Sequence, residues 1–292
     1  MSFLAQQIFW GAVLPAVITA ALLVLLWRAW RREGVPSHGG TPIALALGYL
    51  FAHWRVVGVP MGFPPVDSND WLFVTAALLA IWGIIEHFLA SKPAQRDVGR
   101  LMLAATMSYL ALRPLMGNVW QGASGALWIA SLAAGWWFWW SLQARLADAQ
   151  PGFLLPLILS MVAGGGGFIL LWSNSSSLSQ MSGAVAAVAG VLVPLSLWRR
   201  NGVVGAGGVA FLAGMLGFIW IEAIAFVPVP VWRVAAMALA SLSPLLMLTP
   251  PLRHRSVWIA AALCVVVTAA VLIAVMVPTY RAYMASAGAY GY

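Results

Sequence analysis

Apolar residues form long runs along the whole chain, and short polar segments separate them. A transmembrane helix needs about 20 mostly apolar residues, and ten runs approach that length. They cover residues 7–27, 42–60, 71–90, 101–117, 123–142, 152–172, 179–198, 203–227, 231–250 and 256–278. Because the connections are short, neighbouring helices should be antiparallel. The pattern predicts an all-α polytopic membrane protein with one transmembrane domain.

The composition agrees with a protein whose main solvent is lipid. Of the 292 residues, 63% are hydrophobic and only 8% are charged, whereas a soluble domain has about 25% charged residues. The first apolar run has no basic residue before it, so we expect a retained transmembrane helix and not a cleaved signal peptide. The lipid bilayer is therefore the predicted partner of most of the surface.

The basic residues predict the orientation of the helices, because cytoplasmic loops are enriched in Lys and Arg. Most of them fall in the odd-numbered connections: Arg28, Arg31, Arg32, Lys92, Arg96, Arg100, Arg145, Arg199, Arg200, Arg253 and Arg255. This alternation predicts that both termini are extracytoplasmic. The net charge of +8 is spread over short clusters, which does not favour nucleic-acid binding. The Arg, Ala and Gly bias is typical of a bacterial protein, so we expect the inner membrane.

The segment HWRVVGVPMGFPPVDSNDW, residues 53–71, brings polar residues together at the predicted outer side. His53 and Arg55 end the second predicted helix, and Asp67 and Asp70 precede the third. Asp70 is expected to cap that third helix, and Arg55 to reach the lipid headgroups. The alternative interpretation is a functional site formed by these side chains.

Further polar residues lie at the same predicted depth. Glu222 lies in the last third of the eighth predicted helix, Arg113 ends the fourth and Arg233 begins the ninth. A charged side chain at the centre of a membrane helix costs roughly 2.5–3.5 kcal/mol on insertion scales, so Glu222 should face a partner, and Arg233 is the expected one. Such a pair would be structural, or it would form a gate or a site for an anionic substrate.

Two features lie elsewhere in the predicted helices. Glu86 and His87, near the inner end of the third helix, suggest an ion pair of Glu86 with Lys92 or Arg100, or alternatively a proton relay. Gly164, Gly165, Gly166 and Gly167 in the sixth helix predict either close helix packing or a helix break beside a ligand.

An aromatic run, Trp136 to Trp140, ends the fifth predicted helix. Indole rings are enriched at the membrane interface, so an interfacial anchor is the simplest interpretation. The alternative is a stacking surface for a lipid, a quinone or a partner helix.

Ten helices are compatible with a five-plus-five inverted repeat, as found in many secondary transporters. WGIIEHF (82–88) and WIEAIAF (220–226) occupy the third helix of each half. In helix count the chain resembles the ten-helix drug/metabolite transporters, which are expected to have cytoplasmic termini instead. No motif of that family is present in the sequence.

The sequence predicts no metal site and no cofactor. It contains no HExxH, Walker A or GxSxG motif, its four histidines are scattered, and its one cysteine, Cys264, lies in an apolar run.

The favoured function is a secondary transporter or permease for a small solute. The residues proposed for its substrate site or gate are Glu222, Arg233, Arg113, Arg55, His53, Asp67 and Asp70. One alternative is a non-catalytic subunit or scaffold with membrane-protein partners, or a homo-oligomer. A weaker one is a membrane enzyme acting on lipids at the outer face through His53, Asp67 and Asp70.

Overall fold

The computed structural model describes residues 3–29, 38–60, 62–65, 67–116, 119–120, 122–199, 204–227 and 229–289. Every regular element in these ranges is a helix. In chain order they are α1 (Phe3–Ile8), the π-helix η1 (Phe9–Val13), α2 (Leu14–Ala29), the 3₁₀-helix η2 (His38–Gly40), α3 (Thr41–Val56), α4 (Ser68–Phe88), α5 (Pro93–Met116), α6 (Gly122–Ala149), α7 (Leu154–Trp172), α8 (Ser176–Arg199), α9 (Gly205–Phe226), α10 (Val231–Ala240), the 3₁₀-helix η3 (Ser243–Leu248), α11 (Pro250–Arg253) and α12 (Val257–Ala289). The predicted all-helical class is confirmed.

Among the described residues, six helices are long and apolar enough to cross a membrane. They cover Gln6–Leu26, Ser68–Phe88, Leu154–Trp172, Ser176–Trp198, Gly205–Phe226 and Val257–Ser286. The chain is therefore an α-helical membrane protein.

The count of ten crossings and the inverted repeat stay predictions. Each of the ten predicted ranges contains a helix, but α3 has only 16 residues. In α5, charged side chains occupy the first two turns, at Arg96, Asp97 and Arg100. In α6, Trp, Gly and Ser replace aliphatic residues.

One predicted helix is interrupted. The range 231–250 was expected to be continuous, but α10 ends at Ala240 and η3 follows. Pro244 explains the interruption, because a proline ring clashes with the carbonyl group four residues earlier, which here belongs to Ala240. The last helix is longer than predicted and reaches Ala289.

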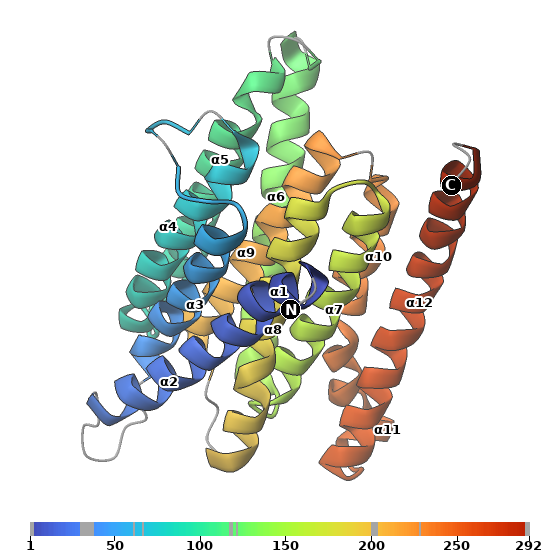
Figure 1. Cartoon of the computed structure of the whole chain (residues 1–292). Coiled ribbons are helices and arrows are strands. Elements are labelled where there is room, and N and C mark those ends of the chain that lie inside the picture. The colour runs from blue at the N-terminus through green and yellow to red at the C-terminus, as the bar shows by residue number, and fades with distance from the viewer. Residues whose placement is uncertain are drawn as a thin grey trace.

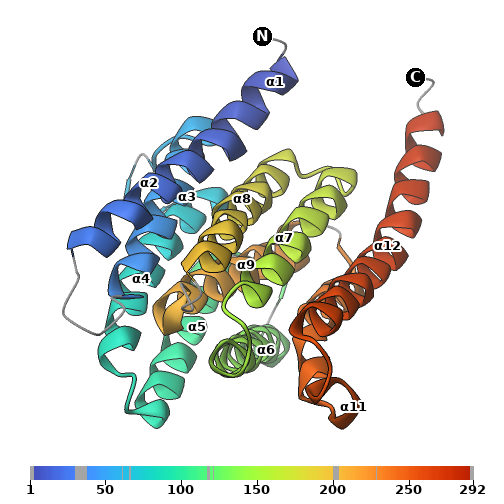
Figure 2. The same ribbon diagram turned by 90° about the horizontal axis from the view of Figure 1, so that it is seen from below.

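The helices form a bundle around α9, which is buried along most of its length. Figures 1 and 2 show α9 enclosed by α3, α4, α6, α7 and α8, while α12 flanks the bundle beside α7 and α10. Glycines allow the closest approach. A Cβ atom on Gly207 of α9 would overlap the carbonyl oxygen of Gly83 on α4. The two backbones can touch only because neither residue has a side chain.

The four glycines of α7 allow close helix packing. The structure shows no helix break at these residues. The helix continues through Gly164–Gly167. A Cβ atom on Gly167 would lie 3.1 Å from the Ser179 carbonyl oxygen of α8. Ser182 donates a hydrogen bond across the same interface to the Ala163 carbonyl oxygen at 2.7 Å. The small residues therefore bring α7 and α8 together while α7 stays regular.

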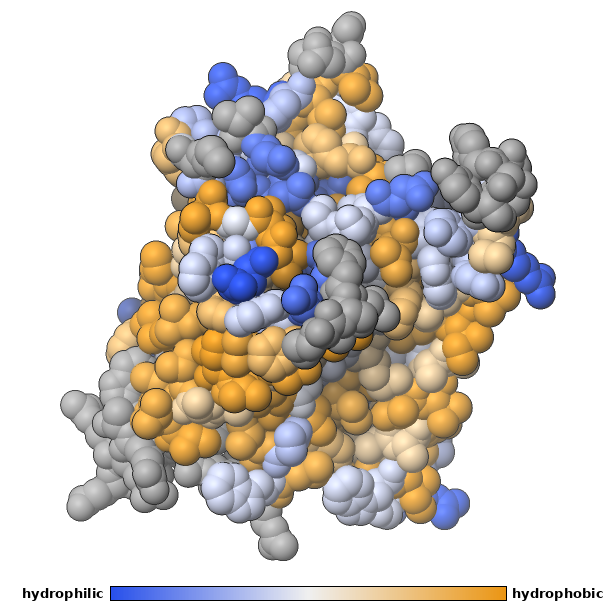
Figure 3. Space-filling model, viewed as in Figure 1, coloured by the Kyte–Doolittle hydropathy of each residue, from blue (hydrophilic) through white to orange (hydrophobic). Residues whose placement is uncertain are grey.

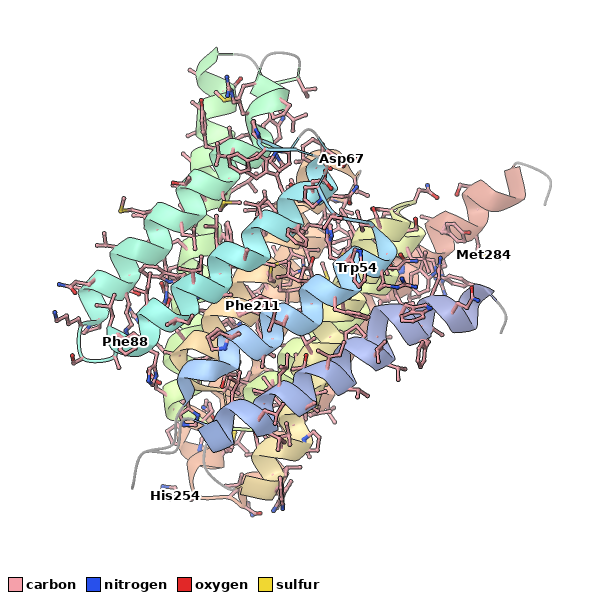
Figure 4. The ribbon with its side chains drawn as sticks, turned by 60° about the vertical axis from the view of Figure 1, so that its left-hand side comes forward. Trp54, Asp67, Phe88, Phe211, His254 and Met284 are labelled. Atoms are coloured by element: carbon pink, nitrogen blue, oxygen red, sulfur yellow. The ribbon has the colours of Figure 1, made fainter. Side chains whose placement is uncertain are left out.

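Successive connections between helices lie at opposite ends of the bundle. In Figure 4, Trp54 and Asp67 lie toward one end and Phe88 and His254 toward the other. Figure 3 shows a broad hydrophobic area over the lower half of one face, with hydrophilic side chains gathered above it.

Some of the basic residues that predict the orientation lie outside the described part of the chain. These are Arg31, Arg32 and Arg200, together with the side chains of Arg28, Arg199 and Arg253.

Candidate functional site

His53 ties the end of α3 to the start of α4. Its side chain is fully buried. Its Nδ1 atom lies 3.0 Å from the Gly58 carbonyl oxygen, and its Nε2 atom lies 3.0 Å from the Asn69 carbonyl oxygen. Both partners are acceptors, so a neutral imidazole donates to only one of them and an imidazolium donates to both. His53 thereby fixes the first turn of α4 above the interior of the bundle.

The N-cap of α4 is Asp67, not Asp70 as the sequence suggested. An Oδ1 atom of Asp67 accepts a hydrogen bond from the Asn69 backbone N–H at 2.9 Å and from the Asn69 side chain at 3.1 Å. Asp70 lies inside the first helical turn, where a carboxylate is favourable because of the helix dipole. The helix begins three residues earlier than expected, because the aspartate before Ser68 already has the extended backbone of a cap.

Glu222 lies on α9 near the end of the helix and is fully buried. Neither of its carboxylate oxygens has a hydrogen-bond partner in the described ranges. The Ser68 side chain of α4 and the Tyr49 ring of α3 are its neighbours, and the Asp67 carboxylate is close enough to repel its charge. The Ser68 hydroxyl faces the carboxyl group without completing a hydrogen bond of ordinary geometry. An unpaired carboxylate is expensive in such a place.

Tyr49 completes this buried group. Its ring lies between α3 and α9, 6.2 Å from the ring of Phe211 and 6.4 Å from the ring of His53 (centroid distances). Figure 4 shows Phe211 deep in the bundle. The Tyr49 hydroxyl is buried and has no hydrogen-bond partner among the residues described. We call Tyr49, His53, Ser68 and Glu222 the outer polar cluster.

The arginines do not join this cluster. The ion pair predicted between Glu222 and Arg233 is absent from the described residues, because Arg233 lies against the Trp232 ring, 5.4 Å from its centroid. Arg55 is exposed and lies over the Trp10 ring at 4.1 Å, a cation–π contact. Arg113 is exposed. No ion pair joins these arginines to Glu222 among the described residues, and the gate or anion site stays a prediction.

Glu86 forms a second, inner polar network. The Arg100 guanidinium group donates two hydrogen bonds to Glu86, from Nε to Oε1 at 2.6 Å and from Nη2 to Oε2 at 2.7 Å. Both side chains are almost completely buried. The Trp82 indole donates a further hydrogen bond to Glu86 at 2.6 Å. The sequence suggested Lys92 or Arg100 as the ion-pair partner of Glu86. The structure pairs Glu86 with Arg100, and Lys92 is exposed.

Asp97 extends the inner network to α6. It accepts hydrogen bonds from Arg100 at 3.1 Å and from Ser141 at 3.1 Å, and Arg145 approaches at 3.4 Å. Because both oxygens of Glu86 are engaged, the geometry favours a structural ion pair over a relay with His87. His87 is the next residue on the helix and packs against Phe88.

The aromatic run of α6 is mostly internal, so the interfacial anchor describes only one of its members well. Trp136, Trp139 and Trp140 are buried, whereas Phe138 is 63% exposed. Trp139 packs on Trp220 with ring centroids 4.7 Å apart. Trp136 packs against Phe218 of α9 with ring centroids 5.7 Å apart, and Gly217 leaves room for its ring.

The sequence identified Glu222, His53 and Asp67, but it missed three members of their surroundings. Tyr49 lies four residues before His53, so both face the same side of α3, and this spacing was an available signal. Ser68 and Asn69 follow the cap, and only the tertiary structure shows that Ser68 lies beside α9. No group of three metal-ligating side chains occurs in the ranges that the structure describes.

No protein-family model, no curated protein and no solved structure matches the chain.

Proposed function

We propose that this protein is a proton-coupled secondary transporter for a small solute, and that Glu222 is the group that takes up and releases the proton. The observation that carries the proposal is the buried Glu222 carboxyl group with two unpaired oxygens. A carboxylate without a cation or a metal beside it can lower its cost by binding a proton. Intramembrane acidic residues of this kind are common in proton pathways.

The surroundings support a cycle of proton binding and release. Glu222 lies beneath the first turn of α4, beside Ser68, and that turn is held by the His53–Asn69 hydrogen bond. Rupture of this bond would free the turn and expose the carboxyl group to the outer side. In this proposal His53 is a positioning residue that holds the closed state, and Tyr49 supplies a buried hydroxyl from α3 in the neighbourhood of Glu222.

The test uses the purified full-length chain in liposomes that contain a pH-sensitive dye. Pools of small solutes are added outside, and solute-dependent proton movement is recorded. We expect Glu222→Gln to reduce this signal to the background of empty liposomes, because an amide does not exchange a proton near neutral pH. Glu222→Asp, which keeps a carboxyl group, is the matched control and should retain part of it.

Infrared difference spectroscopy gives a readout that needs no known solute. A pH step should produce a signal from a buried carboxyl group in the wild type, and Glu222→Gln should remove it. The proposal is wrong if that signal is absent from the wild type. Partners that co-purify in fixed stoichiometry, together with unchanged assembly activity of Glu222→Gln, would instead identify a subunit of a larger complex.

A further inference from the structure

A groove lies between α6 and α10 and has α9 as its floor. Its volume is about 290 Å³, close to the lower limit of about 300 Å³ for typical ligand sites. Four indole rings line it, those of Trp128, Trp136, Trp139 and Trp220. The rest of the lining is apolar or small, and it includes no charged side chain. We call it the tryptophan groove.

The groove is closed toward one end of α10 and open on the flank. Ser241, which follows α10, accepts hydrogen bonds from the Trp139 indole at 2.9 Å and from the Gln143 amide at 2.5 Å. These bonds join α6 to α10. Toward the start of α10 the walls are open, with Val231 46% exposed and Trp128 43% exposed. An occupant therefore enters from the side or from the end nearest to Val231.

Gly135 leaves free space in the wall of the groove. It is exposed, and a Cβ atom built on it would meet no other atom within 4 Å. Gly217 has the opposite role in the floor, because a Cβ atom there would overlap the Trp136 ring. The floor glycine leaves room for the Trp136 indole against α9, and the wall glycine keeps the groove wide.

The size and the chemistry select the occupant. A single turn of a partner helix, 5.4 Å long and about 10–12 Å wide with its side chains, fills roughly 400–600 Å³, more than the 290 Å³ of the groove. A charged solute would find no charged partner in the lining. Trp128 and Val231 at the open wall of the groove are exposed, and α6 lies at the edge of the bundle (Figure 2), so the groove faces the surrounding bilayer lipid. A single hydrocarbon chain fits this shape, and the flat indole faces offer it extensive dispersion contacts.

We propose that the tryptophan groove holds one acyl chain of a membrane phospholipid. Lipid tails are as apolar as the groove, so binding depends on packing against the rings and not on removal from water. The site is separate from the outer polar cluster, and its occupancy can be measured whether or not the protein transports a solute.

The experiment uses the full chain in liposomes with a phosphatidylglycerol that carries a diazirine in one acyl chain. After illumination, mass spectrometry maps the adducts. We expect adducts on α6 and α10 within the groove at a higher yield than on the lipid-facing side of α12, where Val266 and Ile273 are 61% and 59% exposed. The α12 adducts are the internal measure of transient lipid contact.

Gly135→Leu should fill the groove and lower the groove adducts by about tenfold, because about ten dispersion contacts are lost. The α12 adducts should not change. Gly183→Leu is the matched control, since Gly183 also has free space around its Cβ position but lies on α8, away from the groove. Both variants replace a helical glycine with a better helix former, and thermal unfolding would verify that both fold.

Three outcomes overturn the proposal. The first is a yield of groove adducts no higher than that of α12 adducts, which means transient lipid only. The second is an unchanged yield of groove adducts in Gly135→Leu. Finally, a dimer that Gly135→Leu converts to a monomer identifies a second copy of the chain as the occupant.

Discussion

At the scale of single residues, the two buried glutamates show opposite ways of placing a carboxylate inside a membrane protein. Glu86 is bound by Arg100 through two charge-assisted hydrogen bonds and by the Trp82 indole. Glu222 has no such partner among the described residues. The first arrangement stabilises a charge, and the second suits a group whose charge changes. The residue type alone could not distinguish them.

The inner network yields a stability prediction. Arg100→Leu leaves the Glu86 carboxylate buried without its cation, so we expect a loss of about 3–5 kcal/mol in the free energy of unfolding. Asp97→Asn changes a partly exposed member of the network and should cost about 1 kcal/mol or less. Unfolding of both variants in mixed detergent micelles gives the comparison.

A double variant tests the reason for that loss. Glu86→Leu/Arg100→Leu removes both charges and should be more stable than Arg100→Leu alone, because no unpaired charge remains in the interior. If the double variant is the less stable of the two, the energy resides in the hydrogen bonds to Glu86 and not in charge pairing.

At the scale of the helices, the positions of the glycines decide which helices come closest. Gly83 and Gly207 bring the backbones of α4 and α9 into contact, about four helical turns from the Ser68 and Glu222 ends of the two helices. Gly165 and Gly166 of α7 face Leu272 of α12 and Met237 of α10, respectively. Glycine-rich sequence predicts close packing in general, but the partner of each glycine depends on how the helices are arranged around α9.

Gly207→Ala should therefore destabilise the protein by about 1–3 kcal/mol, because the added methyl group overlaps the backbone of α4. Gly164→Ala is the matched control. Its Cβ atom would lie 3.8 Å from the nearest atom, the Cβ of Ala186, and alanine favours a helix by up to about 1 kcal/mol over glycine. Thermal unfolding in detergent should show a lower transition temperature for the first variant and an equal or higher one for the second. Equal behaviour of the two variants would contradict the α4–α9 contact.

At the scale of the whole molecule, the connections alternate between the two ends of the bundle (Figure 1). This arrangement agrees with antiparallel neighbouring helices. Which end of the bundle is cytoplasmic is predicted only from the basic residues. The predicted orientation places the connection at Gly62 and residue Ala123 outside, and Lys92 and Asp148 inside.

Cysteine labelling tests that orientation. In a Cys264→Ala background, single cysteines at Gly62, Ala123, Lys92 and Asp148 are exposed to a membrane-impermeant maleimide. We expect Gly62→Cys and Ala123→Cys to react in intact cells, and Lys92→Cys and Asp148→Cys to react only after permeabilisation. Reaction of Lys92→Cys and Asp148→Cys from opposite sides would refute both the span count and the placement of the outer polar cluster.

The sequence by itself determined the helical class, the membrane setting and the approximate position of each helix. Apolar runs of this length are stable in lipid, and there the backbone must form its hydrogen bonds within a helix. It also identified Glu222 and His53 as unusual, since buried polar groups are costly at such depths. Only the tertiary structure decided their partners. Arg100 binds Glu86 from another helix, and Arg233 packs against Trp232 without an ion pair to Glu222 among the described residues. Trp136 and Trp139 of α6 are buried and line a groove. These outcomes depend on the rotation of each helix around α9, and no local pattern of residues encodes that rotation.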